Sequence, residues 1–201
     1  MEIFEESEEE LLVLPIGDGL SGTYQNAVGA KQSIDENEHI HVLDTKTLAG
    51  PQRYLVQKAM KLKEEGVSLE RMKRELKQCI ETSVSFVIPE DFEFLRRSGR
   101  LTPIAAKLAT MIKIVPVLTQ TEDKKRITLF TIKRSKKKAL LSIIDYLKEI
   151  GVNDDFLITV SHAGVAEEAK KAALKIKENF ADIKTEIFQL PPTLITHGGL
   201  G

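Results

Sequence analysis

The chain has 201 residues, which is enough for one large domain or two smaller lobes. Apolar residues make up 42% of it and charged residues 29%, as expected of a globular protein that buries a substantial core. The formal net charge of −1 gives no electrostatic support to general binding of polyanions such as nucleic acids.

Strand and helix signals alternate along the first 82 residues. Strands are expected at 11–16 and 39–43, and helices at 21–32, at 48–65 and from Ser68 onwards. In the last of these helices, apolar residues recur at three-to-four spacing and predict one inward face: Leu69, Met72, Leu76 and Ile80.

A second run of alternating signals begins at residue 83. The expected strands cover 83–88, 114–120, 127–133, 156–160 and 185–190. The expected helices cover 91–98, 102–113, a segment capped by Ser135, and 165–180. A charged turn at 122–125 predicts an antiparallel hairpin, and 196–201 is expected to be a loop. The pattern favours an α/β fold in two lobes, 1–82 and 83–201, the second with a mixed sheet.

Cysteine content and hydropathy indicate the cellular compartment of the protein. The single cysteine, Cys79, excludes an internal disulfide, fits a reducing compartment, and is expected in the core. No apolar run reaches the roughly 18 residues of a membrane span. Residues 1–10 are acidic, the reverse of a secretory signal. We therefore expect a cytoplasmic protein without stable membrane insertion.

The segment that follows the first strand carries the most chemical information. It has the sequence PIGDGLSGTYQ, from Pro15 to Gln25. A strand, a glycine loop and a hydroxyl residue that opens a helix present backbone N–H groups and the positive helix end to an anion. Ser21, with Gly22 beside it, is therefore a candidate ligand for a carboxylate or phosphate. The alternative is that Ser21 acts only as the N-cap of the helix.

Three further side chains are candidates for an anion site. Arg100 follows a glycine in a turn, which can project its guanidinium into a cleft to pair with a carboxylate or phosphate. Arg134 lies in a basic run where a helix starts, a place that disfavours cations unless an anion is bound. His197 lies in a glycine-rich segment, where the backbone can approach a ligand closely. The alternative for each is a solvated surface side chain.

Other site chemistries find less support. The four histidines and one cysteine lack the spacing of metal ligands, so no metal site is expected. Ser21 and His197 would allow a hydrolase, but the glycine segment is not the G-x-S-x-G elbow of the α/β hydrolases. No Gly-Lys-Ser/Thr follows the glycines, which excludes a Walker-type nucleotide loop. We expect a binding protein that is not an enzyme and needs no cofactor.

Five short segments occur together in a characteristic order. They are GLSGTYQNA (19–27), VLDTK (42–46), FLRRSGRL (94–101), IVPVL (114–118) and THGGLG (196–201). In this combination the chain, from about residue 4 to 201, resembles the DegV family of bacterial proteins that bind a long-chain fatty acid. The third segment is similar to the family's L-x-R-G-G-R-I, with Ser98 in place of a glycine.

The resemblance implies a two-lobed fold with the fatty acid in an apolar tunnel between the lobes. The serine of the LSGTY motif, Ser21 here, would hold the carboxylate together with a hydroxyl from a Thr-Ser-Gln-Pro segment that this sequence does not contain. In members that serve as fatty-acid-kinase subunits, the positions matching Arg100, Arg134 and His197 hold the acyl phosphate and meet the kinase. The tunnel wall is expected from Leu101, Ile104 and 105–112, including Leu108.

The expected function is therefore to bind a long-chain fatty acid and to present its carboxylate to a separate kinase. The acyl phosphate so formed would feed phospholipid synthesis. The alternatives are a small-ester hydrolase that uses Ser21 and His197, and a remnant that binds no ligand. The family's first segment and last strand have no match here, so a truncated first lobe, exposed sheet edges and reduced stability are expected.

Overall fold

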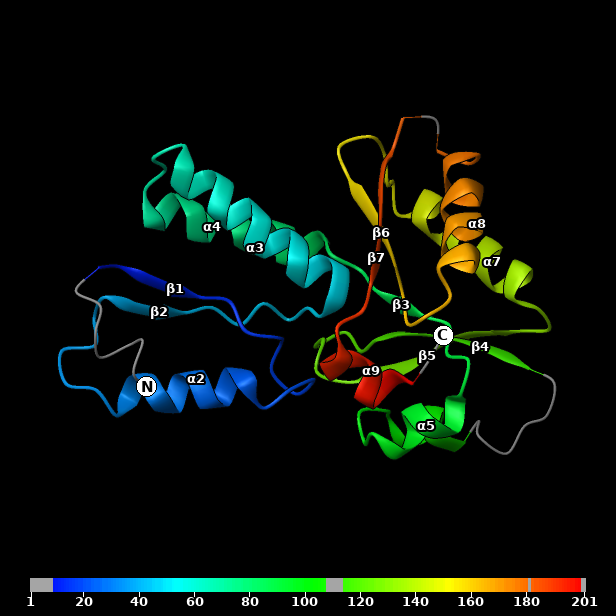
Figure 1. Cartoon of the computed structure of the whole chain (residues 1–201), viewed down its shortest axis with the longest axis horizontal. Helices are drawn as coiled ribbons and strands as arrows, with labels where there is room; N and C mark the ends of the chain where they lie inside the picture. Colours follow the sequence, from blue (N-terminus) through cyan, green and yellow to red (C-terminus); the bar gives the residue numbers. More distant parts are fainter. Residues whose placement is uncertain (1–8, 108–113, 181, 200–201) are drawn as a thin grey trace. The chain divides into compact units, whose positions relative to one another are not determined.

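The computed structural model describes residues 9–107, 114–180 and 182–199, and it divides into two compact units. The first consists of Met1–Val84 with Glu122–Lys125, and the second of Ser85–Thr121 with Arg126–Gly201. Helices alternate with parallel and antiparallel strands, so the predicted α/β class with mixed sheets is confirmed (Figure 1). That these units correspond to two DegV lobes, 1–82 and 83–201, stays a prediction.

The first unit is built on a pair of short parallel strands, β1 (Leu11–Val13) and β2 (Ile40–Val42). Parallel strands need a crossover connection, which the helix α2 (Thr23–Gln32) supplies. In Figure 1, α2 lies on one side of the strand pair, and α3 (Ala49–Glu64) and α4 (Leu69–Thr82) lie on the other. The unit therefore has helices on both faces of its strands.

The core of the first unit lies between α3 and α4. Leu55 and Leu62 of α3 pack with three residues of the predicted inward face of α4: Met72, Leu76 and Ile80. Leu69, the fourth residue of that predicted face, is only half-buried. Cys79 is partly buried and packs against this cluster, as expected for a core cysteine.

The second unit contains an antiparallel sheet in the order β3-β4-β5. Its strands are β3 (Phe86–Val87), β4 (Val115–Gln120) and β5 (Ile127–Lys133), and the predicted β4–β5 hairpin is confirmed. The helix α7 (Lys136–Glu149) covers this sheet through three edge-to-face rings, Phe86, Phe130 and Tyr146, whose centroids lie 5.0, 5.2 and 5.7 Å apart. Each such pair adds about 0.5–1.5 kcal/mol beyond the burial of its area.

A parallel pair of strands completes the second unit. β6 (Leu157–His162) pairs with β7 (Lys184–Gln189), and α8 (Ala166–Lys177) connects them. Three short helices lie elsewhere in this unit: α5 (Phe92–Arg97) and α6 (Pro103–Ala106) between β3 and β4, and α9 (Pro192–Gly198) after β7. In the part of the chain that the structure describes, no helix is both long and apolar enough to cross a membrane.

Two of the differences from the prediction affect candidate ligand residues. α2 begins at Thr23 with Gly22 as its N-cap, so Ser21 lies before the helix and does not open it. The predicted loop at the end of the chain is helical as far as Gly198, because Pro192 supplies the fixed φ of a first helical residue and Gly199, at φ 82°, ends the helix. Of the predicted helix 102–113, residues 108–113 lie outside the described part.

Candidate functional site

Two of the segments singled out in the sequence, PIGDGLSGTYQ and VLDTK, lie against each other in the first unit. Each follows a strand of the parallel pair, at the carboxyl edge where α/β proteins commonly place ligands. The Leu43 N–H donates to the Val13 carbonyl at 3.0 Å, and the Gly17 N–H donates to the Thr47 carbonyl at 2.9 Å. The glycine loop is therefore fixed at its base by the end of the second strand.

The side chains of Thr45 and Gln52 satisfy the carbonyls of the segment between β1 and the loop. The Thr45 hydroxyl donates to the Pro15 carbonyl at 2.6 Å, and the Gln52 amide donates to the Leu14 carbonyl at 2.5 Å. Thr47 donates in turn to the Gln52 side-chain oxygen at 3.0 Å. These bonds replace a strand ladder beyond Val13, which explains why β1 is shorter than the predicted strand 11–16.

Gly17 is the point of closest backbone approach in the loop. A Cβ placed there would lie 2.6 Å from the Cα of Lys46 and 2.8 Å from its carbonyl carbon. Its own carbonyl accepts the N–H groups of Leu20 at 3.2 Å and Ser21 at 3.3 Å. The tight turn that presents Ser21 therefore depends on glycine at position 17.

Ser21 is half-buried and contributes its hydroxyl, not its amide, to the loop surface. The expectation of free amides at this point was wrong for Leu20 and Ser21, whose N–H groups bond Gly17, and for Thr23, whose N–H donates to Ser21 Oγ at 3.3 Å. A hydroxyl that accepts one bond retains its proton for donation. Ser21 can therefore donate to a carboxylate oxygen while the Thr23 amide orients it.

Gly22 is exposed and occupies the N-cap position of α2. Among the described residues, nothing lies within 4 Å of a Cβ added at Gly22. Packing within the described part of the unit therefore does not require glycine there, in contrast to position 17.

Asp18 is a charged loop residue that sequence reasoning missed. Its carboxylate accepts a bond from Gln25 Nε2 at 3.1 Å and pairs with Lys125 Nζ at 2.8 Å. The bond from Lys125, followed by that from Gln25, lowers the pKa of Asp18 below its ordinary value of 3.8. No local pattern pointed to this pair, since its members are 107 residues apart.

In the second unit, Arg100 lies in a turn that is paired with the start of β5. Gly99 takes a φ of 74°, and the Arg100 carbonyl then accepts the Ile127 N–H at 3.0 Å. Arg100 is half-buried, and its Nη1 donates to the Ser98 carbonyl at 2.5 Å. The predicted turn is thus present, and one N–H of the guanidinium bonds within it.

His197 is exposed and lies in the last turn of α9, so its predicted place in a loop was wrong. The helices α5 and α9 contact each other (Figure 1). A Cβ added at Gly199 would lie 3.4 Å from the ring of Phe94. The segments FLRRSGRL and THGGLG, which carry Arg100 and His197, therefore adjoin in the second unit.

Arg134 is exposed between β5 and α7, as its sequence predicted. Ser135 caps the helix by accepting the Lys138 N–H at 3.3 Å. Lys136 pairs with Glu90 and, at 2.8 Å, with Glu168, so part of the basic run is neutralised within the unit. Ser21 and Gly22 belong to the first unit and the three cationic candidates to the second, and a common site for them stays a prediction.

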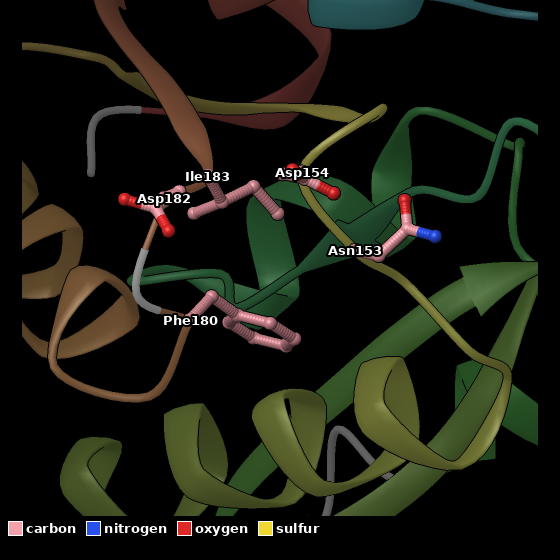
Figure 2. A pocket seen from close by; sticks show the side chains of 5 residues that line it. All are labelled: Asn153, Asp154, Phe180, Asp182 and Ile183. Carbon is pink, nitrogen blue, oxygen red and sulfur yellow. The ribbon is translucent and has the colours of Figure 1, made fainter.

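A pocket of about 300 Å³ in the second unit contains none of the predicted ligand residues. Its lining residues, shown in Figure 2, are Asn153, Asp154, Phe180, Asp182 and Ile183. Two carboxylates in the lining make it unfavourable for the carboxylate of a fatty acid.

The predicted tunnel wall is described only in part, since residues 108–113 lie outside the described ranges. Of its described residues, Leu101 and Ala105 are buried, whereas Ile104 is 72% exposed. Nor do the described ranges contain a group of three His, Cys, Asp or Glu side chains arranged to hold a metal ion.

Comparison with known proteins agrees with these motifs. Residues 1–201 match the family model described as "Uncharacterised protein, DegV family". The DegV domain-containing protein YteA of Lactococcus lactis subsp. lactis (strain IL1403) is 33% identical over 205 residues, which cover 98% of this chain and 69% of the relative.

Solved structures share the fold. DegV, a fatty acid binding protein from Bacillus subtilis, is 26% identical with a TM-score of 0.82, covering 100% of this chain and 72% of its own. A DegV family protein from Thermus thermophilus, whose structure concerns its fatty acid binding, is 27% identical with a TM-score of 0.84, covering 100% and 70%. The family model matches the whole chain, and the predicted resemblance is confirmed: the chain belongs to the DegV family.

Proposed function

We propose that this protein binds a long-chain fatty acid and that Ser21 donates a hydrogen bond to the fatty-acid carboxylate. The observation that carries the proposal is the Ser21 hydroxyl, which accepts the Thr23 N–H at 3.3 Å and keeps its proton for a ligand. The loop that presents it is fixed by buried bonds from the VLDTK segment and the residue that follows it. Such a preorganised donor needs little rearrangement when an anion binds.

Similar proteins support a fatty acid as the ligand. The Bacillus subtilis and Streptococcus agalactiae proteins, each 26% identical to this chain, are described as fatty acid binding members of the family. An acyl chain supplies most of the driving force itself, at roughly 0.8 kcal/mol for each methylene that leaves water. The hydroxyl then sets the orientation of the head group.

We further propose that the bound carboxylate is presented to a separate kinase in the cytoplasm and converted to an acyl phosphate for phospholipid synthesis. The turn that carries Arg100 and the helix that carries His197 belong to adjoining segments, and Arg134 is an exposed cation. Cations near the head group favour the acyl phosphate over the free acid, because phosphorylation adds negative charge. In this proposal the protein is a carrier, and the kinase performs the catalysis.

The alternative of a small-ester hydrolase gains no support from the loop. In the described residues, the hydrogen-bond partner found for the Ser21 hydroxyl is the Thr23 amide and not the imidazole of a general base. Ser21 is thus arranged as a donor to an anion. The third alternative, a chain without a ligand, is distinguished by direct measurement of binding.

The test is the affinity for oleate of the wild type and of Ser21→Ala, measured by isothermal titration calorimetry. A hydrogen bond to a charged group contributes about 1.5–3 kcal/mol, so Ser21→Ala should raise Kd roughly 10- to 150-fold. The matched control is Ser33→Ala at the end of α2, whose hydroxyl donates to the Gly29 carbonyl. If Ser21→Ala bound oleate with wild-type affinity but had a lower melting temperature, Ser21 would have only a structural role.

A further inference from the structure

The turn between β4 and β5 belongs to the first unit, although its strands belong to the second. Glu122–Lys125 clusters with the first unit. The turn is closed by the Thr121 N–H, which donates to the Arg126 carbonyl at 2.9 Å, and by the Arg126 N–H, which donates to Thr121 Oγ1 at 3.1 Å. Two lysines of the turn, Lys124 and Lys125, bond other residues of the first unit.

Lys124 anchors the turn on α4. Its Nζ donates to the carbonyls of Ile80 at 2.5 Å and Ser83 at 2.9 Å, at the carboxyl end of the helix. An ammonium group is favoured there by the helix dipole and by the unpaired carbonyls of the last turn. Lys124 therefore fixes the position of its neighbour, Lys125.

Lys125 contacts the glycine loop through both its backbone and its side chain. A Cβ added at Gly19 would lie 2.7 Å from the Lys125 carbonyl oxygen and 2.8 Å from its Cβ. Its Nζ lies 2.8 Å from Asp18 Oδ2. The turn and the loop thus meet at two consecutive loop residues, immediately before Leu20 and Ser21.

The charged side chains near the contact between Lys125 and the glycine loop would affect the binding of an anionic ligand. Asp18 lies three residues before Ser21 in the loop, and its N–H donates to Asp44 Oδ1 at 3.0 Å. The negative charge of the Asp18 carboxylate would repel a fatty-acid carboxylate at Ser21. Lys125 pairs with Asp18, and the hydrogen bond and charge of Asp18 raise the pKa of Lys125; the charges of Asp123 and Asp44 raise it to a smaller extent. Lys125 is thus a cation placed to offset the Asp18 carboxylate.

We propose that Lys125 is a positioning residue for the fatty-acid site: its ion pair with Asp18 offsets the Asp18 charge, which would otherwise repel a carboxylate at Ser21. The inference rests on the proposed function of Ser21. The Lys125 side chain is 53% exposed, and ion pairs at such surfaces add little to stability. Its effect should therefore appear in ligand affinity and not in the stability of the fold.

The test measures oleate affinity of the full chain at low ionic strength for the wild type, Lys125→Met, Lys125→Arg and the double variant Asp18→Asn/Lys125→Met. Lys125→Met leaves Asp18 uncompensated and should raise Kd about five- to tenfold, with a smaller rise in 0.5 M salt. Lys125→Arg and the double variant should both return Kd to within about twofold of the wild type. The control is Lys63→Met at the exposed end of α3, which should bind as the wild type does.

The possible outcomes distinguish a failure of the proposed role of Lys125 from a failure of the proposed fatty-acid binding. Absence of oleate binding by the wild type would overturn the proposed function. Binding by the wild type together with unchanged affinity in Lys125→Met would overturn the role of Lys125 alone. A fall in the melting temperature of Lys125→Met that the double variant shares, without recovery of affinity, would also overturn it, because the pair would then be structural.

Discussion

The hydroxyl of Thr45 donates to the carbonyl of Pro15 at 2.6 Å and so joins two residues that lie 30 positions apart in the chain. Thr45 is fully buried, whereas Pro15 is half-buried. The polypeptide leaves β1 at this point and turns into the glycine loop. The orientation of the loop, and with it that of Ser21, therefore depends on buried side-chain bonds more than on a strand ladder.

Replacing Thr45 by valine should destabilise the protein by about 1–3 kcal/mol, because the partly buried Pro15 carbonyl would lose its donor. Chemical denaturation measures the free energy of unfolding. Thr82→Val is the control, since the Thr82 hydroxyl bonds its own helix at an exposed position. Equal and small effects of the two substitutions would contradict the importance of the Thr45 bond.

Substitution of two glycines by alanine should have effects of opposite sign. Gly17→Ala forces a Cβ against the backbone of Lys46 and should cost about 1–3 kcal/mol of stability. Gly29→Ala lies within α2 with nothing within 4 Å among the described residues, and it should stabilise by about 0.5–1 kcal/mol. Thermal unfolding of both variants measures this difference. A stable Gly17→Ala variant that binds oleate normally would show that the loop tolerates displacement.

Arg100→Gln, Arg134→Gln and His197→Gln should each lower acyl-phosphate formation with a cognate kinase by about tenfold, while retention of fatty acid stays near that of the wild type. The added negative charge appears only on phosphoryl transfer, so the cations matter most there. Lys177→Gln at the exposed end of α8 is the control. Equal loss of fatty-acid retention in all three variants would place them at the carboxylate instead.

The contribution of Asp18 to the stability of the folded protein should be lost on acidification. Lys125 and Gln25 lower the pKa of Asp18 in the folded protein below its ordinary 3.8. A depressed folded pKa contributes stability that is present above the unfolded pKa and is lost as pH falls through the folded pKa. The small difference in melting temperature between the wild type and Asp18→Asn should be constant from about pH 6 to 8 and should vanish on acidification below 3.8. A difference that grows on acidification would contradict the pairing.

Local sequence signals predicted the elements whose determinants are local. The three-to-four spacing of Met72, Leu76 and Ile80 was sufficient to assign the buried face of α4. Ser135 caps α7 as predicted, and alternating residues around a charged turn gave the β4–β5 hairpin. These features depend on contacts between near neighbours, which composition and periodicity record.

The features that were not predicted depend on contacts that local sequence patterns do not indicate. The Gly17 carbonyl draws the Ser21 N–H into the loop turn, which moves the start of α2 to Thr23. The end of α9 was open to prediction from Pro192 and Gly199, a signal that the glycine-rich segment obscured. The pairing of Asp18 with Lys125 joins residues 107 positions apart, so it required the folded structure.

Fatty-acid binding by this protein is tested most directly by mass spectrometry of the purified protein, native and after lipid extraction. We expect one long-chain fatty acid per folded chain, with lower occupancy in Ser21→Ala than in Ser33→Ala. A folded chain, verified by cooperative thermal unfolding, that carries no fatty acid and takes up no added oleate would contradict it.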